Sequence, residues 1–338
     1  MEFEYTDPQT ELEKLMGGFY YINAFGHIEP GDDVKFQNLL TRASPPSVTC
    51  VYINSLGGHV ESAINIGRTI REWRLSTEVG TYLLQQEDAS APIIRRNLLP
   101  GKCMSAATLL YLGGRLRHFH EGAQFGVHQF SYKNPSPEHV GQSQILSAKI
   151  AGYVADMGIS PAFLEISSST PSNDLKLIDK DTLNRLGVIT GGITDVRWTV
   201  EARCGILYVR GERDSIFGHH KVMLIYAKES GFLFHAVIEA QGRQTELTEF
   251  PLVELVLNNE ETVWDISQRA LRFVNGADVN IVVKLDDTEA STIASSNGFG
   301  VRVRSSGEAP MFLGISPMNT DGGKEQLETF YSVLGGGH

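Results

Sequence analysis

The first two thirds of the chain alternate between β-branched hydrophobic runs and patterns with helical spacing. The hydrophobic runs predict strands at 18–26, 48–54, 77–84 and 125–128. Apolar positions three or four residues apart predict helices at 32–43, 60–73, 105–112, 136–157 and 179–186, with a further helix beginning at Ser160. Strands separated by helices favour parallel pairing with right-handed crossovers. The polar stretch 85–100 interrupts this order and is predicted to be a loop, with Arg95 and Arg96 facing solvent.

From about residue 197 the pattern changes to strands that are joined by short polar turns. These strands are expected at 197–202, 205–209, 221–226, 232–238, 279–283 and 300–303, and a helix is expected near 324–333. Helical crossovers are missing between the early strands, so antiparallel pairing is expected. The sequence therefore predicts an α/β domain over 1–196 and a β-rich, mostly antiparallel α+β domain over 197–338.

Length and charge narrow the class of protein. The 338 residues suit about two domains. A net charge of −11 argues against a nucleic-acid partner, which requires a basic surface. No apolar run approaches the roughly 20 residues of a membrane span, and the acidic N-terminus lacks the features of a secretory signal. Neither a membrane nor a secreted location is expected.

The cysteines and histidines do not form a metal-binding pattern. Cys50, Cys103 and Cys204 are widely spaced, which suits a reducing cytoplasm. His219 and His220 are expected in a turn without acidic or thiol ligands at metal spacing. We therefore expect a cytoplasmic protein without a metal ion or other cofactor.

Three residues in the first domain could form a nucleophilic site. Ser105 begins a short apolar helix, and a serine hydroxyl needs a base to become a nucleophile. His128, at the end of a buried strand, is the expected base. A carboxylate orients such a histidine best, and Asp174 is the best-placed candidate. The order Ser, His, Asp and the lack of a G-x-S-x-G motif disfavour an α/β-hydrolase.

An acyl-transfer site also needs N–H donors for the developing oxyanion. The amides of Gly57 and Gly58, where a strand turns into a helix, and the amide of Ala106 are the candidates. Glycine permits positive φ and a close approach of substrate. Cys103 is expected to pack in the core, and His59 is expected to face solvent at the start of a helix.

Together these segments resemble the proteolytic subunit of the Clp protease, within the crotonase-like superfamily. The resemblance covers residues 18–198 and rests on Ile53–Val60 (I-N-S-L-G-G-H-V), Lys102–Ala107 and Gly126–Gln129, with Asp174 near the family's aspartate. Leu56 replaces the usual proline, the stretch 85–100 is an insertion, and the family has no β-rich tail.

The resemblance implies a ββα spiral fold and a serine endopeptidase with the triad Ser105, His128 and Asp174. It implies that peptide binds as an added strand beside Gly57–Val60 and the residues after His128, so that His59, Val60, Gln129 and Phe130 contact substrate. It also implies a homo-oligomer in which helix 136–157 is the "handle". Whether an unfolding ATPase or another regulatory partner acts on it stays open.

The sequence leaves two alternatives. One is a catalytically silent scaffold of the same fold whose second domain binds a protein or a small ligand, because fold does not guarantee chemistry. The other is acyl-CoA chemistry, which is less favoured because it does not usually need a Ser–His pair. If the protein is instead a serine peptidase, the second domain is expected to control access to the active site or to recruit substrate.

Overall fold

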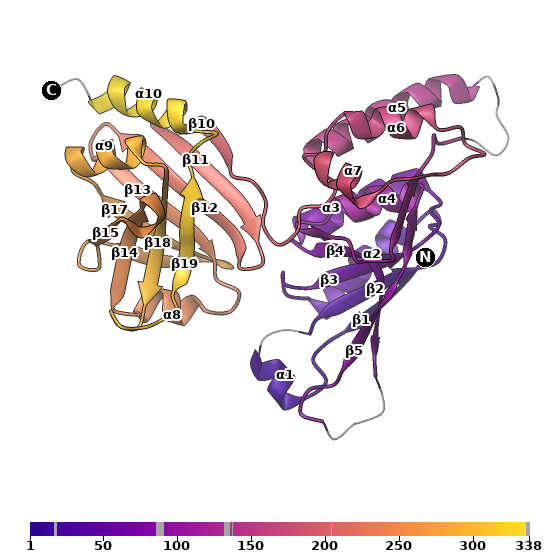
Figure 1. Cartoon of the computed structure of the whole chain (residues 1–338), viewed down its shortest axis with the longest axis horizontal. Coiled ribbons are helices and arrows are strands. Elements are labelled where there is room, and N and C mark those ends of the chain that lie inside the picture. The colour runs from indigo at the N-terminus through magenta and orange to yellow at the C-terminus, as the bar shows by residue number, and fades with distance from the viewer. Residues whose placement is uncertain (17–18, 86–90, 132–135, 137, 204, 336–338) are drawn as a thin grey trace. The chain divides into compact units, whose positions relative to one another are not determined.

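The computed structural model describes residues 1–338 except 17–18, 86–90, 132–135, 137, 204 and 336–338. Its chain forms two compact units, Met1–Gly192 and Ile193–His338 (Figure 1). The sequence pattern places the boundary four residues later than the contacts do.

Unit 1 contains a six-stranded sheet with a parallel centre. Its strands are β1 (Glu2–Thr6), β2 (Tyr21–Phe25), β3 (Cys50–Asn54), β4 (Ser76–Leu84), β5 (Arg96–Pro100) and β7 (Arg117–His118). β2, β3 and β4 pair in parallel, as the alternation of strands and helices predicts, and β7 also joins β4 in parallel. β1 and β5 add antiparallel at the two ends.

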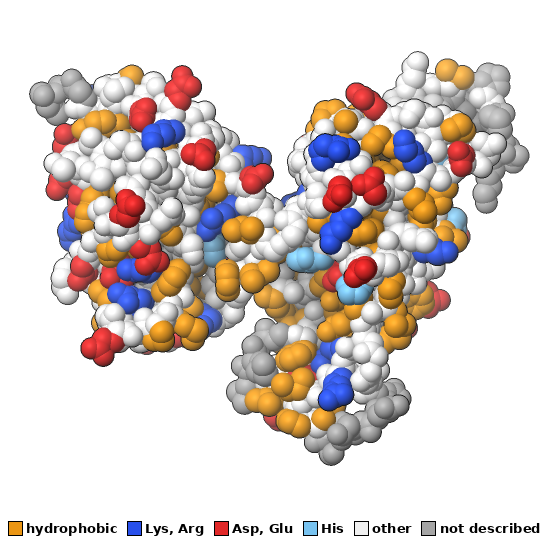
Figure 2. All heavy atoms as spheres, in the orientation of Figure 1, with side chains coloured by type: hydrophobic (Ala, Val, Ile, Leu, Met, Phe, Trp, Pro, Cys, Tyr) orange, Lys and Arg blue, Asp and Glu red, His pale blue; other side chains and the backbone are white. Residues whose placement is uncertain are grey.

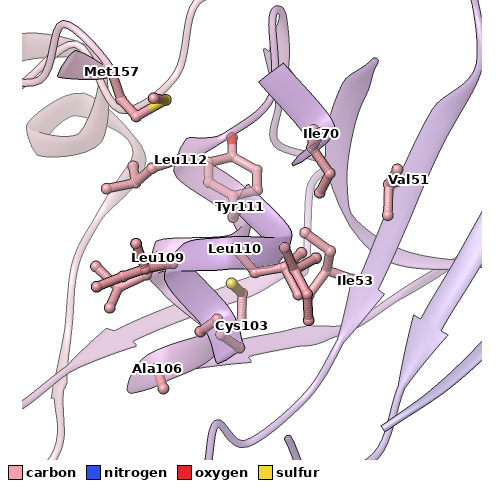
Figure 3. Close-up of a cluster of buried hydrophobic side chains, with 14 of the residues drawn as sticks. Val51, Ile53, Ile70, Cys103, Ala106, Leu109, Leu110, Tyr111, Leu112 and Met157 are labelled. Atoms are coloured by element: carbon pink, nitrogen blue, oxygen red, sulfur yellow. The ribbon is translucent and has the colours of Figure 1, made fainter. Parts of the chain in front are cut away.

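Most helices of unit 1 pack apolar side chains into one core: α2 (Asp32–Ala43), α3 (Val60–Glu72), α4 (Ala106–Leu112), α5 (Glu138–Asp156), α6 (Ala162–Ser169) and α7 (Lys180–Arg185). In α1 (Glu11–Met16), Leu12 is exposed and Glu13 is buried. α3 buries one stripe and exposes Glu61 and Asn65 on the other, as its spacing predicts. All seven residues of α4 are buried, and Figure 3 shows Leu110 beside Ile53 in this core.

A second, three-stranded sheet carries the segments with candidate chemistry. Its order is β6 (Lys102–Met104), β8 (Gln124–Val127) and β9 (Lys176–Leu177). β6 and β8 are parallel, whereas β9 is antiparallel to β8. A bridge between Ser55 and Cys103 joins the start of this sheet to the end of β3. The two strand ends that matter for the site are thus held side by side.

The prediction of a solvent-exposed loop over 85–100 was wrong for its last five residues. Arg96–Pro100 form β5, which pairs antiparallel with β4 and extends the main sheet. Residues 91–95 lie outside strands and helices and Arg95 is exposed, as predicted, whereas 86–90 lie outside the described residues. The side chain of Arg96 is only 2% exposed and forms an ion pair with the fully buried Glu13, at 2.8 Å. The buried acidic partner, which lies 83 residues earlier, explains why a charged strand packs here and why local polarity misled the prediction.

Unit 2 is built from two antiparallel sheets around a second core. The six-stranded sheet has the order β10 (Arg197–Arg203), β11 (Ile206–Ser215), β12 (Gly218–Ala227), β13 (Gly231–Glu239), β17 (Asp278–Lys284) and β16 (Leu271–Asn275). The four-stranded sheet has the order β15 (Thr262–Asp265), β14 (Leu252–Leu257), β18 (Gly298–Arg304) and β19 (Leu313–Asn319). The helical elements are α8 (Gln244–Glu249), the short 3-10 helix η1 (Asn258–Glu260), α9 (Asp287–Ser295) and α10 (Lys324–Gly335).

His219 and His220 lie in strand β12 rather than in a turn, which corrects the sequence prediction. His219 Nδ1 lies 2.9 Å from Asp214 Oδ1 across the β11–β12 pair. Within the part of the chain that the structure covers, no group of three or more metal-binding side chains occurs.

The surface of each unit mixes both signs of charge. On the face shown in Figure 2, acidic and basic side chains are interspersed, with hydrophobic side chains among them. None of the helices in the described ranges is both long and apolar enough to cross a bilayer.

Candidate functional site

Ser105 occupies a strained turn between β6 and α4. Its backbone has φ 53° and ψ −127°, a conformation that residues other than glycine adopt at a cost of about 1–3 kcal/mol. The strain is held in place by two main-chain bonds: Ser105 N–H donates to Gly126 O at 2.8 Å, and Thr108 N–H donates to Ser105 O at 3.0 Å. A serine on a sharp strand-to-helix turn is the backbone arrangement that presents the nucleophile in α/β-hydrolases.

Gly57 packs directly against this turn. A Cβ atom at Gly57 would lie 2.8 Å from both Met104 O and Ser105 Cβ, and 3.0 Å from Ala106 N. Gly57 also has a φ of 102°, which favours glycine. The Gly57–Gly58 segment and the turn at Ser105 therefore meet with no room for a side chain between them.

The small sheet brings the three predicted residues to one end. Met104 pairs with Gly126 across the parallel strands β6 and β8, so Ser105 and His128 both follow the carboxyl ends of neighbouring strands. Val127 pairs with Lys176 on β9, and the segment that leads into this strand contains Asp174. The strand order β6-β8-β9 places the histidine strand between the serine strand and the aspartate strand.

The three side chains are not joined by hydrogen bonds among the residues that the structure describes. His128 Nδ1 lies 2.7 Å from the main-chain oxygen of Gln129. Asp174 Oδ1 accepts a hydrogen bond from Leu175 N–H at 2.7 Å, and the Asp174 side chain is exposed. The catalytic roles of Ser105, His128 and Asp174 stay predictions.

The candidate oxyanion donors differ in their partners. Gly57 N–H donates to Ser55 Oγ at 3.1 Å and is thus already engaged. Gly58 forms a parallel bridge with Ile28, in which Ile28 N–H donates to Gly57 O and His59 N–H donates to Ile28 O. This bonding pattern turns the N–H of Gly58 away from Ile28. The N–H of Ala106, as the first residue of α4, has no acceptor within the helix.

The residues expected to contact substrate surround this turn. His59 is the N-cap of α3, and its ring nitrogen accepts the Ser62 N–H at 3.3 Å, so the ring has a local structural partner. Val60 begins α3 and packs against the core. Gln129 is exposed, and Phe130 is half-buried. Their contacts with substrate stay predictions.

Cys103 is completely buried beneath the site, and burial raises the pKa of its thiol well above the ordinary value. A buried, protonated thiol packs as a small apolar group. Figure 3 shows its sulfur within the hydrophobic cluster under α4.

Sequence reasoning missed two residues that position the site. Ile28 holds Gly57–His59 through the bridge described above. Thr170, at the end of α6, accepts the Gln129 N–H through its main-chain oxygen at 2.9 Å. Both act through main-chain atoms, so no side-chain pattern in the sequence marks them.

No protein-family model and no curated protein matches the chain. Among solved structures, the chain is similar to a ClpP1 variant from Listeria monocytogenes, with 20% identity and a TM-score of 0.35. The similarity covers 50% of this chain and 88% of that one. It is a weak likeness of fold, limited to half of the chain, and carries no information on activity.

Proposed function

We propose that unit 1 is a Clp-like serine peptidase with Ser105 as nucleophile and His128 as general base. The observation that carries the proposal is the strained backbone of Ser105 at φ 53° and ψ −127°, against the glycine segment 57–58. Strain of this kind persists only where the surrounding structure enforces it, and it gathers at functional sites. The register of β6 and β8 supports the pairing with His128.

In this proposal, the Oγ atom of Ser105 forms a bond to the carbonyl carbon of a peptide while its proton passes to His128 Nε2. The N–H groups of Gly58 and Ala106 stabilise the oxyanion, because Gly57 N–H is already bonded to Ser55. His128 then returns the proton to the leaving amine as the C–N bond breaks. A water molecule, activated by the same imidazole, hydrolyses the acyl-enzyme and restores the serine.

The test is covalent labelling with a fluorophosphonate probe. Wild type is expected to label at Ser105, whereas Ser105→Ala and His128→Ala are not. Thr108→Val is a matched control, because it removes a nearby hydroxyl, which donates to Ser105 O, and leaves the side chains of Ser105 and His128 unchanged. This variant is expected to label. A wild type that stays unlabelled, or a Ser105→Ala variant that labels equally, contradicts the proposal.

The alternative is a silent scaffold of the same fold, since the described side chains of Ser105, His128 and Asp174 form no hydrogen bonds with one another. In that case unit 2 provides the activity by binding a protein or a small ligand. Wild type would then stay unlabelled at every probe concentration while it remains folded. In the peptidase proposal, unit 2 instead controls access or recruits substrate.

We also propose that the protein self-associates through α5. The first part of this helix exposes Val140 and Ile145, at 64% and 60%, whereas Tyr153 and Val154 near its end are buried in unit 1. Exposed apolar side chains on one stretch of a helix suit contact with another subunit. Light scattering is expected to give an oligomeric mass for wild type and a lower mass for Val140→Asp combined with Ile145→Asp. A monomeric wild type contradicts this assembly.

A further inference from the structure

The orientation of His128 depends on a main-chain atom that no sequence motif marks. Its Nδ1 atom lies 2.7 Å from the carbonyl oxygen of the next residue, Gln129. A carbonyl oxygen accepts hydrogen bonds and cannot donate them. Nδ1 must therefore carry the proton in this arrangement, and the neutral ring keeps its lone pair on Nε2. This is the tautomer that a general base for Ser105 requires.

The main chain of Gln129 is anchored from outside the site. Gln129 N–H donates to Thr170 O at 2.9 Å. Thr170 is buried, and its hydroxyl donates to Ile166 O at 2.9 Å, within the last turn of α6. The residue that carries the acceptor beside His128 is thus tied to a helix end through its main chain.

Asp174 forms its hydrogen bonds within a local turn. One carboxylate oxygen accepts the N–H of Leu175 at 2.7 Å, and the Asp174 N–H donates to Pro171 O. Its side chain is exposed, so water competes for any contact that it makes with an imidazole. These bonds form a local turn that is complete without His128.

We infer that the main-chain carbonyl of Gln129, rather than the carboxylate of Asp174, orients His128 as the base. The inference rests on the proposed function for its catalytic meaning, although the hydrogen bond itself exists without activity. Gln129 is a positioning residue, because it acts on substrate only through the imidazole. A neutral carbonyl fixes the tautomer but stabilises the imidazolium less than a carboxylate does.

If the Gln129 carbonyl orients His128, replacement of Asp174 is expected to change the labelling rate only slightly. In a triad that relies on its aspartate, replacement by asparagine lowers the rate about 10⁴-fold, since the wrong tautomer is held. Here Asp174→Asn and Asp174→Ala are expected to label with fluorophosphonate within about tenfold of the wild-type rate.

A spectroscopic readout separates positioning from general stability. Nitrogen-15 NMR of the full chain, at a pH where the ring is neutral, reports which ring nitrogen carries the proton. The His128 signal is identified by its loss in His128→Gln. We expect the Nδ1–H tautomer in wild type and in Asp174→Asn alike.

An Nε2–H tautomer in wild type overturns the inference. So does a tautomer that changes in Asp174→Asn, or a loss of labelling near 10⁴-fold in Asp174→Asn while wild type labels. The serine peptidase proposal is decided separately, by whether wild type labels at Ser105. If wild type does not label at all, the peptidase proposal and the catalytic meaning of the inference fail together, and the tautomer alone decides whether the hydrogen bond to Gln129 exists.

Discussion

Replacement of Gly57 by alanine tests how the two segments of the site meet. The new Cβ would lie 2.8 Å from Met104 O and from Ser105 Cβ, and 3.0 Å from Ala106 N, so the backbone of the Ser105 turn must shift. Two costs combine. A side chain at φ 102° costs about 1–2 kcal/mol, and overpacking in a fixed environment costs about 1–3 kcal/mol more. We therefore expect a loss of about 2–5 kcal/mol in the stability of unit 1.

Gly31→Ala separates these two costs. Gly31 has a similar φ of 89°, but a Cβ there would meet no atom within 4 Å. This variant is expected to lose only the conformational part, about 1–2 kcal/mol. Hydrogen exchange of the buried α4 amides, measured by mass spectrometry on the full chain, reports the stability of unit 1 separately from that of unit 2.

The same substitution also acts on chemistry. A displacement of about 1 Å at a reacting group lowers the rate about 10²-fold, so fluorophosphonate labelling of Gly57→Ala is expected to slow by at least that factor. Gly31→Ala is expected to label like wild type. The reasoning is refuted if the two variants lose equal stability, or if Gly57→Ala labels at the wild-type rate.

Three further predictions follow from the strain and burial in unit 1. Ser105→Gly relieves the positive φ and is expected to stabilise unit 1 by about 1 kcal/mol relative to Ser105→Ala, while both variants lose labelling; equal stability would contradict the strain. Gly113→Ala places a Cβ 2.1 Å from Gly67 O, where α3 meets α4, and is expected to destabilise unit 1 by about 3 kcal/mol or to prevent its folding, which thermal denaturation measures. The hydrogen bonds from Arg96 outweigh the effect of burial and lower the pKa of the Glu13 carboxyl from 4.5 to about 2. The contribution of the ionised Glu13 to the stability of unit 1 is therefore complete above pH 4.5 and is lost as the pH falls towards 2. Glu13→Gln is expected to destabilise unit 1 by about 3–5 kcal/mol at pH 7 and to reduce this acid sensitivity; an unchanged stability curve between pH 2 and 5 would contradict it.

Much of the local structure of unit 1 could be predicted from hydrophobic periodicity. The helix predicted at 32–43 is α2, with the same bounds, and the helix predicted at 60–73 ends one residue early, at Glu72. Both helices have one buried stripe, which is the feature that periodicity detects. The parallel order of β2, β3 and β4 followed from the helices between them.

Elements that depend on distant partners escaped prediction. β5 begins with Arg96, whose charge is buried against Glu13, and the sequence does not show that these two residues meet. In unit 2, by contrast, β14, β15, β16 and β19 were not predicted although a local signal was available. β14 is a hydrophobic run, and β14–β15 and β16–β17 pair as neighbours along the chain.

The candidate site was also predicted only in part. The sequence pattern identified Ser105, His128 and the glycine pair, because glycine and a lone serine at strand ends are visible as residue types. The hydrogen bonds of Ser55, Gln129 and Asp174 could not be read from residue types, since each of them involves a main-chain atom whose direction depends on the local fold.

The complete burial of α4 has a consequence for how the chain tolerates sequence change. A helix with one solvent-facing side, such as α3, accepts replacements every third or fourth residue, at positions like Glu61 and Asn65. α4 has no such side, so a saturation mutagenesis profile across its seven residues should be uniformly intolerant, with no helical period. Amino-acid replacements would then be found in the segments on either side of α4, while the sequence of the helix that begins after Ser105 stays almost constant.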